Sequence, residues 1–303
     1  MAHDDEDAEF RRAVEHNEAK RQAAQADRQE RELNQEEEEE AVRDASHMSA
    51  KLVYQVVRRE GDDELLRPST ALFWSGIAAG VCISFSVIGQ GIFHAWLPEA
   101  EWRPLVESFG YTFGFLIVII GRMQLFTENT LTTVLPLLAR PSRLLLVSVA
   151  RLWGIVALAN VIGCFIAAVF IAYIPAFEPE VVEGMMTVSH HALGLAPLTA
   201  FFKAIPAGLL IAALVWMLAA GERTSFLVIF VMTWLIAAGG FTHIIAGSAE
   251  MALLIVTGEL GIIRAVFGFW VPVFLGNVFG GTVVFSMITW GQVREEVKAR
   301  RAA

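Results

Sequence analysis

The chain has 303 residues, of which 55% are hydrophobic, and its mean hydropathy is +0.53. This value excludes an ordinary soluble globular domain and indicates that the lipid bilayer is the solvent for most of the chain. The formal net charge of −9 lies entirely before Pro68, where 20 acidic residues face 11 basic ones, whereas the rest of the chain carries 12 of each. The two parts are therefore adapted to different surroundings.

Residues 1–66 are rich in Glu, Asp, Arg, Gln and Ala and include the acidic run Glu36–Glu40. Because few apolar residues are available for a core, we predict an acidic cytoplasmic tail that is helical or disordered. It contains no apolar stretch of the kind that a cleavable signal peptide needs. Near its end, apolar residues recur at helical spacing over 48–66, which predicts an amphipathic helix at the membrane surface.

Six apolar segments follow, at about 70–97, 108–136, 142–175, 197–220, 225–256 and 262–291. Each exceeds the roughly 20 residues that a helix needs to cross the hydrocarbon core of a bilayer. The sequence therefore predicts an all-α membrane protein with a six-helix transmembrane channel domain over 67–292 and a basic cytoplasmic C-terminus over 293–303. The second loop is basic and the third is acidic, so we expect both termini on the cytoplasmic side.

The two halves of the membrane part share short patterns in the same order. GIAAGVCISF (76–85) aligns without gaps to AIPAGLLIAA (204–213), and ANVIGC (159–164) corresponds to GNVFGG (276–281). The second and fifth segments share the Phe-Thr of LFTENTL (125–131) and GFTHIIAG (240–247). Since each half has three spans, the halves would enter the membrane from opposite sides, which is typical of an inverted-topology repeat.

LFTENTL and GFTHIIAG both place polar residues inside long apolar runs. We predict that spans two and five are broken there, because irregular backbone at this depth is tolerated only where it lines a cavity or is buried in protein. The half-helices that resume would point their N-termini at the middle of the membrane, where their partial positive charge favours an anion. The paired breaks therefore predict a pathway between the two halves.

At these residues the chain resembles the formate/nitrite transporter family. LFTEN is similar to the second-helix motif of that family, GFTH to the stretch with its central histidine, GNVFGG to its sixth-helix motif, and FFKAIPAG (201–208) to the start of its fourth helix. The resemblance covers about 70–292. It implies an aquaporin-like fold, a homopentamer with one pore per protomer, and transport of small monovalent anions such as formate, nitrite, lactate or hydrosulfide across the inner membrane. The long acidic extension is not typical of the best-known members.

The resemblance also implies a set of functional residues. His243 and Thr127 match the pore histidine and threonine, and Asn160 and Asn277 match structural asparagines near the repeat axis. The implied pore and substrate residues are His243, Thr127, Leu125, Phe126, Phe241, Ile236, Glu128 and Asn129. We expect no metal, no cofactor, no enzymatic activity and no nucleic-acid partner.

Several positions depart from the usual pattern of the family. Gly247 and Gly208 stand where an asparagine is usual, and Glu128 stands where a glycine or serine is usual. The lysine that often precedes the fourth helix is absent, and we expect Lys203, which begins the fourth segment, to reach the surface. These departures leave the identity of the solute and its coupling to protons open.

The residue types at the breaks indicate how a solute would be handled. The imidazole of His243 can donate a hydrogen bond to an anion or transfer a proton to it, and a weak acid that crosses protonated avoids the cost of a bare charge. The hydroxyl of Thr127 can donate to an oxyanion. The neighbouring Leu125, Phe126 and Phe241 are candidates for apolar gates, with ordinary packing as the alternative.

Charged residues within the apolar segments leave competing functions open. Arg122, Glu128 and Glu250 are expensive inside a membrane, so we expect Arg122 to pair with one of the two glutamates. A glutamate that faces the pore would repel anions. One alternative is therefore an aquaporin-like channel for a small neutral solute, and another is a non-conducting scaffold whose acidic tail binds a cytoplasmic partner.

Overall fold

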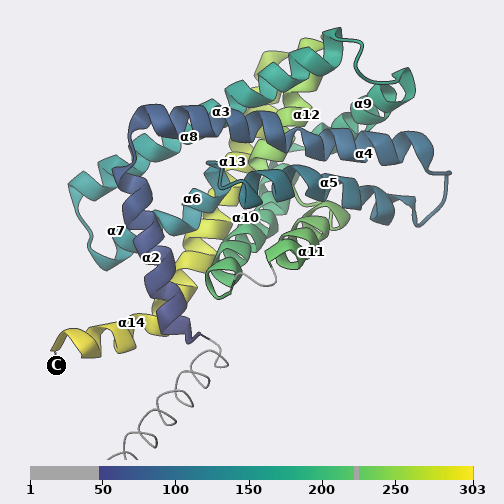
Figure 1. The fold of residues 1–303 in the computed structure, drawn as a ribbon. Helices are drawn as coiled ribbons and strands as arrows, with labels where there is room; N and C mark the ends of the chain where they lie inside the picture. Colours follow the sequence, from purple (N-terminus) through teal and green to yellow (C-terminus); the bar gives the residue numbers. More distant parts are fainter. Residues whose placement is uncertain (1–47, 222–224, 303) are drawn as a thin grey trace, which may run out of the picture. The chain divides into compact units, whose positions relative to one another are not determined.

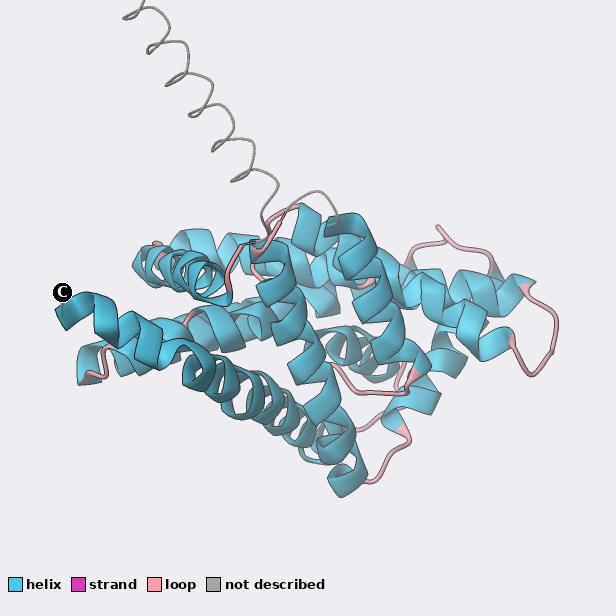
Figure 2. Ribbon diagram, turned by 90° about the horizontal axis from the view of Figure 1, so that it is seen from below, coloured by secondary structure: helices cyan, strands magenta, loops and turns pink. Residues whose placement is uncertain are grey.

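The computed structural model describes residues 48–221 and 225–302, with side chains up to Glu295. Within these ranges the secondary structure is helical and no strand occurs, as the all-α prediction requires (Figures 1 and 2). Residues Ser49–Ala303 form one compact unit. The acidic tail lies outside the described residues as far as residue 47.

Helix α2 (Ala50–Leu66) begins after Ser49, whose hydroxyl accepts a hydrogen bond from the Leu52 amide at 3.3 Å. Its apolar face is buried against α6, α7 and α10, with Tyr54 and Val57 fully covered. Gly61 lies so close to the next layer that a Cβ there would be 1.9 Å from the carbonyl oxygen of Thr132. The predicted amphipathic helix is present, and its apolar face packs on protein.

Among the residues that the structure describes, five helices are long and apolar enough to cross a membrane, by length and composition. They are α3 (Ser69–Ile83) with α4 (Phe85–Trp96), α5 (Arg103–Ile120), α8 (Arg143–Tyr173), α10 (Pro197–Ala219), and the stretch Arg264–Glu295. That last stretch runs through η2 (Arg264–Trp270), α13 (Val271–Val278), η3 (Phe279–Ser286) and α14 (Met287–Ala302). The remaining apolar segment is divided between two shorter helices, α11 (Ser225–Ala238) and α12 (Ile244–Val256).

The second and fifth segments are broken where the polar residues interrupt them. In the second, α5 ends at Ile120 and the chain resumes as α6 (Phe126–Thr132) and α7 (Val134–Ala139). In the fifth, α11 ends at Ala238 and α12 begins at Ile244. The intervening residues 121–125 and 239–243 are the two breaks, and both are followed by a buried half-helix.

Helix α9 (Pro179–Leu193) is a feature that the sequence analysis missed. It occupies the acidic third loop and packs against α4 and α12. Close contact with α4 depends on glycine, since a Cβ at Gly91 would lie 2.4 Å from Met185. A proline at its first position, followed by glutamates, is a helix-start signal that could have revealed it.

Two helix pairs position the breaks, and both rely on small residues. Helix α3 packs on α8, and α10 packs on α13 (Figure 1). A Cβ at Gly80 would lie 2.0 Å from the Asn160 carbonyl oxygen, and one at Gly208 would lie 2.2 Å from that of Asn277. Small residues let apolar helices approach this closely, which brings each asparagine against the adjacent break.

Candidate functional site

The two breaks have the same backbone course. Each contains one residue with positive φ, Arg122 at 52° and Gly240 at 60°, and each ends with an extended residue, Leu125 or His243, directly before its half-helix. The same backbone bond closes both turns: Met123 N–H donates to Val118 O at 3.0 Å and Phe241 N–H donates to Ile236 O at 2.9 Å. Positions in the two breaks therefore correspond one to one.

Asn160 of α8 holds the first break through three hydrogen bonds. Its Oδ1 accepts from the Phe126 amide at 3.0 Å, and its Nδ2 donates to the carbonyl oxygens of Gly76 and Gln124, both at 2.8 Å. The side chain is fully buried. Backbone groups freed by the break are thus satisfied inside the protein, as burial in an apolar medium demands.

Asn277 of α13 makes the same three bonds to the second break. Its Oδ1 accepts from the Ile244 amide at 2.7 Å, and its Nδ2 donates to Ala204 O at 2.8 Å and to Thr242 O at 3.0 Å. It is also fully buried. Because the asparagines take the first amide of each half-helix, those amides are not available to a passing anion.

These bonds correct the register of the second and fifth segments. The position equivalent to Phe126 is Ile244, and the position equivalent to Leu125 is His243. The alignment of the shared Phe-Thr dipeptides, which pairs Phe126 with Phe241, is therefore wrong by three residues. The physical reason is that one dipeptide begins its half-helix while the other still belongs to the break.

Thr127 and His243 meet between the two half-helices. Thr127 Oγ1 and His243 Nε2 are 2.8 Å apart, and both residues are at most 1% exposed. His243 Nδ1 accepts from the Ala246 amide at 3.2 Å, so it caps α12 and carries no proton. The hydrogen-bond network thus assigns the proton of the neutral ring to Nε2, which donates to Thr127 and leaves the threonine hydroxyl hydrogen for another partner.

A cavity of about 110 Å³ reaches His243 from one side. Its polar lining comes from Gln90 of α4, Tyr111 of α5, His191 of α9, Lys203 of α10 and Glu250 of α12. Lys203, which we expected to reach the surface, is partly exposed and also lines the cavity. Gln90 and Tyr111 were not predicted, because single polar residues at such positions give no sequence signal.

The candidate gate residues near Thr127 and His243 do not all line the cavity. Phe241 lines the cavity, whereas Leu125 and Phe126 are fully buried next to Thr127. Phe126 stacks on Phe274 with ring centroids 5.0 Å apart. Ile236 is fully buried and is not among the residues that line this cavity.

Acidic and amide side chains gather where α6 begins. Glu128 lies in the first turn of α6, and its Oε1 is buried without a hydrogen-bond partner. Asn129 Nδ2 donates to Gln124 Oε1 at 3.2 Å, and Gln124 Nε2 donates to Glu64 of α2 at 2.7 Å. Asn129 therefore holds the first break to α2 through Gln124.

Arg122 pairs with a residue that the sequence analysis did not consider. Its Nη1 lies 4.0 Å from Glu60 Oε1 of α2. The expected partner was Glu128 or Glu250. Burial raises the pKa of the Glu60 carboxyl, and the Arg122 charge opposes that shift.

Two of the departures from the family pattern have a steric explanation. A Cβ at Gly247 would lie 2.5 Å from the ring of Phe269, which fills the space beside the cavity. At Gly208 the Asn277 backbone leaves no room for a side chain. This backbone therefore leaves no room for an asparagine at position 208, and an asparagine at position 247 would require the ring of Phe269 to shift.

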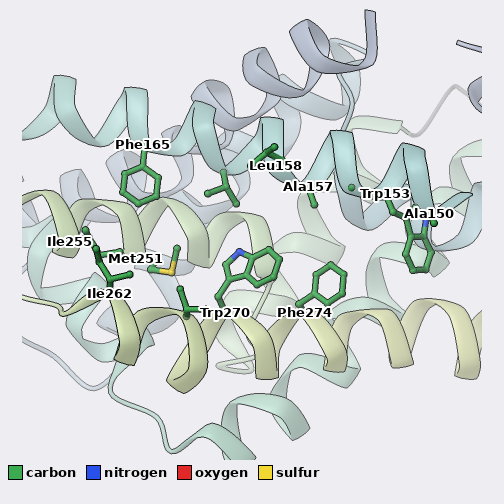
Figure 3. A pocket seen from close by; sticks show the side chains of 13 residues that line it. Ala150, Trp153, Ala157, Leu158, Phe165, Met251, Ile255, Ile262, Trp270 and Phe274 are labelled. Atoms are coloured by element: carbon green, nitrogen blue, oxygen red, sulfur yellow. The ribbon is translucent and has the colours of Figure 1, made fainter. Parts of the chain in front are cut away.

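A larger cavity lies away from the Thr127–His243 pair. Its volume is about 720 Å³, and it is formed by α8, α12 and the residues from Ile262 to Phe274 (Figure 3). Among its lining residues, the only side-chain nitrogens or oxygens are the indole nitrogens of Trp153 and Trp270. Trp153 already donates to Thr133 Oγ1 at 3.0 Å. Polar groups that could orient an anion converge on the smaller cavity instead.

Comparison with known proteins places the chain among membrane transporters. Residues 51–291 match the family model described as formate/nitrite transporter. The "Inner membrane protein YfdC" of Escherichia coli (strain K12) is 38% identical over 254 residues, which are 84% of this chain and 82% of the relative. The "Formate channel FocA" of Haemophilus influenzae is 26% identical over 242 residues, or 71% of this chain and 84% of the relative.

Solved structures share the fold. A structure described as "Pentameric formate channel with formate bound" matches 73% of this chain and 96% of its own with a TM-score of 0.63 at 20% identity. Another, described as "FNT family ion channel", matches 80% and 96% with a TM-score of 0.63 at 21% identity. The family model spans most of the sequence and a relative at 38% identity covers most of its length. The chain therefore belongs to the formate/nitrite transporter family.

Proposed function

We propose that this protein is a channel or proton-coupled transporter for small monovalent weak-acid anions of the formate, nitrite, lactate and hydrosulfide class. The observation that carries the proposal is the 2.8 Å hydrogen bond between Thr127 and His243, where the two broken segments meet. A relative whose name is formate channel and a solved formate channel of the same fold support the solute class.

The proposed pathway runs from the cavity past Phe241 to the Thr127–His243 pair. Lys203 and His191 at the cavity attract a small anion, and the free hydroxyl hydrogen of Thr127 donates to one of its oxygens. Leu125 and Phe126 surround this point with apolar surface. Such a constriction excludes water and hydrated ions, so the solute must shed its hydration shell at the pair.

The proposed architecture has two inverted three-helix repeats with spans two and five broken, in a multi-pass protein of the inner membrane. The matched hydrogen bonds of Asn160 and Asn277 support the repeat. The solved formate channel of this fold is described as pentameric, and we extend that assembly to this chain. The proposal keeps both termini in the cytoplasm, with the acidic segment 1–66 open to a cytoplasmic partner and 67–292 as the channel domain.

Buried carboxyl groups favour a second candidate, a channel for a small neutral solute. Glu128 follows Thr127 directly, and Glu250 lines the cavity at His243. Ionised carboxylates at these points would repel an anion. A neutral weak acid or another small neutral molecule would not meet this barrier.

Uptake by proteoliposomes distinguishes the candidates. Gradients of formate, nitrite and lactate are applied at about pH 5.5 and about pH 7.5, on either side of the usual histidine pKa. We expect saturable or channel-like uptake that falls on the order of tenfold or more in His243→Ala, because the pair is lost. The matched control is His190→Ala, an exposed histidine that bonds to Glu259. Uptake of a neutral solute without any of the three anions would favour the second candidate.

A further inference from the structure

Glu250 is a buried acid with no assigned partner in the cavity beside His243. The residue is 6% exposed and lies on α12. Within the described residues its carboxyl group forms no hydrogen bond and no ion pair. The cavity also contains Gln90 Oε1, a buried acceptor without a donor. Two acceptors that lack donors point to a ligand that supplies a proton or a hydrogen-bond donor.

In this arrangement the ring of His243 cannot accept a second proton and pass it to the solute. Its Nε2 proton is donated to Thr127, and its Nδ1 lone pair accepts from the Ala246 amide. A second proton on the ring would displace the cap of α12, a half-helix that is buried over most of its length. The group that exchanges protons with the solute must therefore be sought elsewhere in the cavity.

The other titratable groups that face the cavity are Tyr111 of α5, His191 of α9 and Lys203 of α10. His191 is exposed at the mouth, and Lys203 Nζ lies against the backbone of Gly240. Tyr111 is 6% exposed and would give up a phenolic proton only at high pH. Glu250 is the buried carboxyl among them, and it shares α12 with the histidine cap.

We propose that Glu250 is the proton donor of the pathway, which converts an incoming weak-acid anion to its neutral form before the anion reaches Thr127 and His243. This inference rests on the proposed function. The cavity of about 110 Å³ has room for a formate-sized solute, since a water molecule takes roughly 30 Å³.

The step transfers one proton and no electrons. The O–H bond of the Glu250 carboxylic acid breaks, a new O–H bond forms on the anion, and the charge remains on the carboxylate of Glu250. The neutral acid then passes the apolar residues around the pair without carrying a bare charge through them. Solvent at the cavity mouth returns a proton to Glu250 and completes the cycle. Net movement is one proton with each anion.

The test measures proton and formate entry together. The full chain is reconstituted in vesicles that hold a pH-sensitive dye, isotopically labelled formate is supplied outside, and the membrane potential is clamped with potassium and an ionophore. The variants are Glu250→Gln, which keeps the shape, and Glu250→Asp, which keeps the carboxyl group. Glu180→Gln, at an exposed position on α9, is the matched control. Size-exclusion elution of each purified variant checks its folding.

We expect wild type and Glu180→Gln to take up one proton per formate, with uptake insensitive to the clamped potential. Glu250→Gln should lose proton uptake on the order of a hundredfold, as for removal of a general acid, and any residual formate entry should respond to potential. Glu250→Asp should restore part of the coupled uptake.

The inference is overturned if Glu250→Gln keeps the wild-type proton-to-formate ratio and a rate within about twofold of wild type, far from the loss expected for a general acid. It is also overturned if Glu250→Gln and Glu250→Asp are both inactive although they elute as wild type does, since a carboxyl group would then not suffice. If wild type itself moves none of the anions, the proposed function fails instead.

Discussion

The break between α5 and α6 and the break between α11 and α12 correspond position by position in their backbone hydrogen bonds, yet they carry different side chains. Each places a positive-φ residue before an extended residue, and each is held by a buried asparagine through three hydrogen bonds. At the extended position, however, one break has Leu125, which forms no side-chain cap, and the other has His243, which does.

The difference extends into the half-helices. Thr127 corresponds to Ile245, and Glu128 corresponds to Ala246. At each of these positions one break is polar where the other is apolar, and the polar groups of the two breaks meet as Thr127 and His243. The comparison teaches that the same turn and the same asparagine contacts interrupt two apolar segments, while the side chains that join the breaks, Thr127 and His243, occupy positions that are not equivalent.

The largest expected effect is on the scaffold. Asn160→Ala and Asn277→Ala each remove three buried hydrogen bonds to the backbone, and we expect each to reduce the free energy of unfolding by about 2 to 4 kcal/mol. Asn129→Ala, which loses contacts within its own break, should cost less. Melting of the purified protein in detergent measures the loss. Unequal costs at Asn160 and Asn277 would show that the two halves do not share one scaffold.

The next largest effect is expected at Thr127, whose equivalent position in the other break is the apolar Ile245. Thr127→Val removes the hydroxyl group and keeps the shape, so we expect anion uptake to fall about tenfold because a buried hydrogen-bonding partner of His243 is lost. Ile245→Val, at the equivalent position of the other break, should leave uptake near the wild-type rate. The measurement is the proteoliposome assay. Equal losses in both variants would indicate that packing, and not the hydroxyl group, determines the rate.

A smaller effect is expected at the positive-φ positions. Gly240→Ala forces a Cβ into the left-handed region and should lower stability by about 1 kcal/mol, whereas Arg122→Gly relieves the same strain at the other break. The gain at Arg122 is offset in part by the lost pair with Glu60. Melting temperatures of both variants check the signs. A stabilising Gly240→Ala would contradict the equivalence of the two turns.

The smallest effect is expected at Glu60 of α2, which pairs with Arg122 in the first break. Burial raises the pKa of Glu60 above its usual value of 4.5, so the folded state favours the protonated carboxyl group. The stability gained by protonating Glu60 in the folded state is fully present below pH 4.5. It is lost as the pH rises through the higher pKa of Glu60 in the folded state. Glu60→Gln should therefore flatten the fall of the melting temperature over this range, while Glu178→Gln, at an exposed position, should not change it.

The sequence was informative wherever one local pattern implies one structure. Polar residues inside long apolar runs predict the two breaks, because unsatisfied backbone in a membrane needs a special environment. The spacing of apolar residues over 48–66 predicts helix α2. It does not reveal that Tyr54 and Val57 are buried by α7 and α10, since a face that fits lipid fits protein equally well.

The composition and motifs of this sequence determined by themselves an all-α membrane chain, its two interrupted segments and its family. Tertiary structure alone decided the register of the breaks, the partner of Arg122 and the place of Lys203 and Glu250 in one cavity. The physical reason is that hydropathy and helix interruption depend on residues that are close together in the sequence. The pairing of Thr127 with His243 depends instead on contacts between distant parts of the sequence, including the two asparagines that hold the breaks.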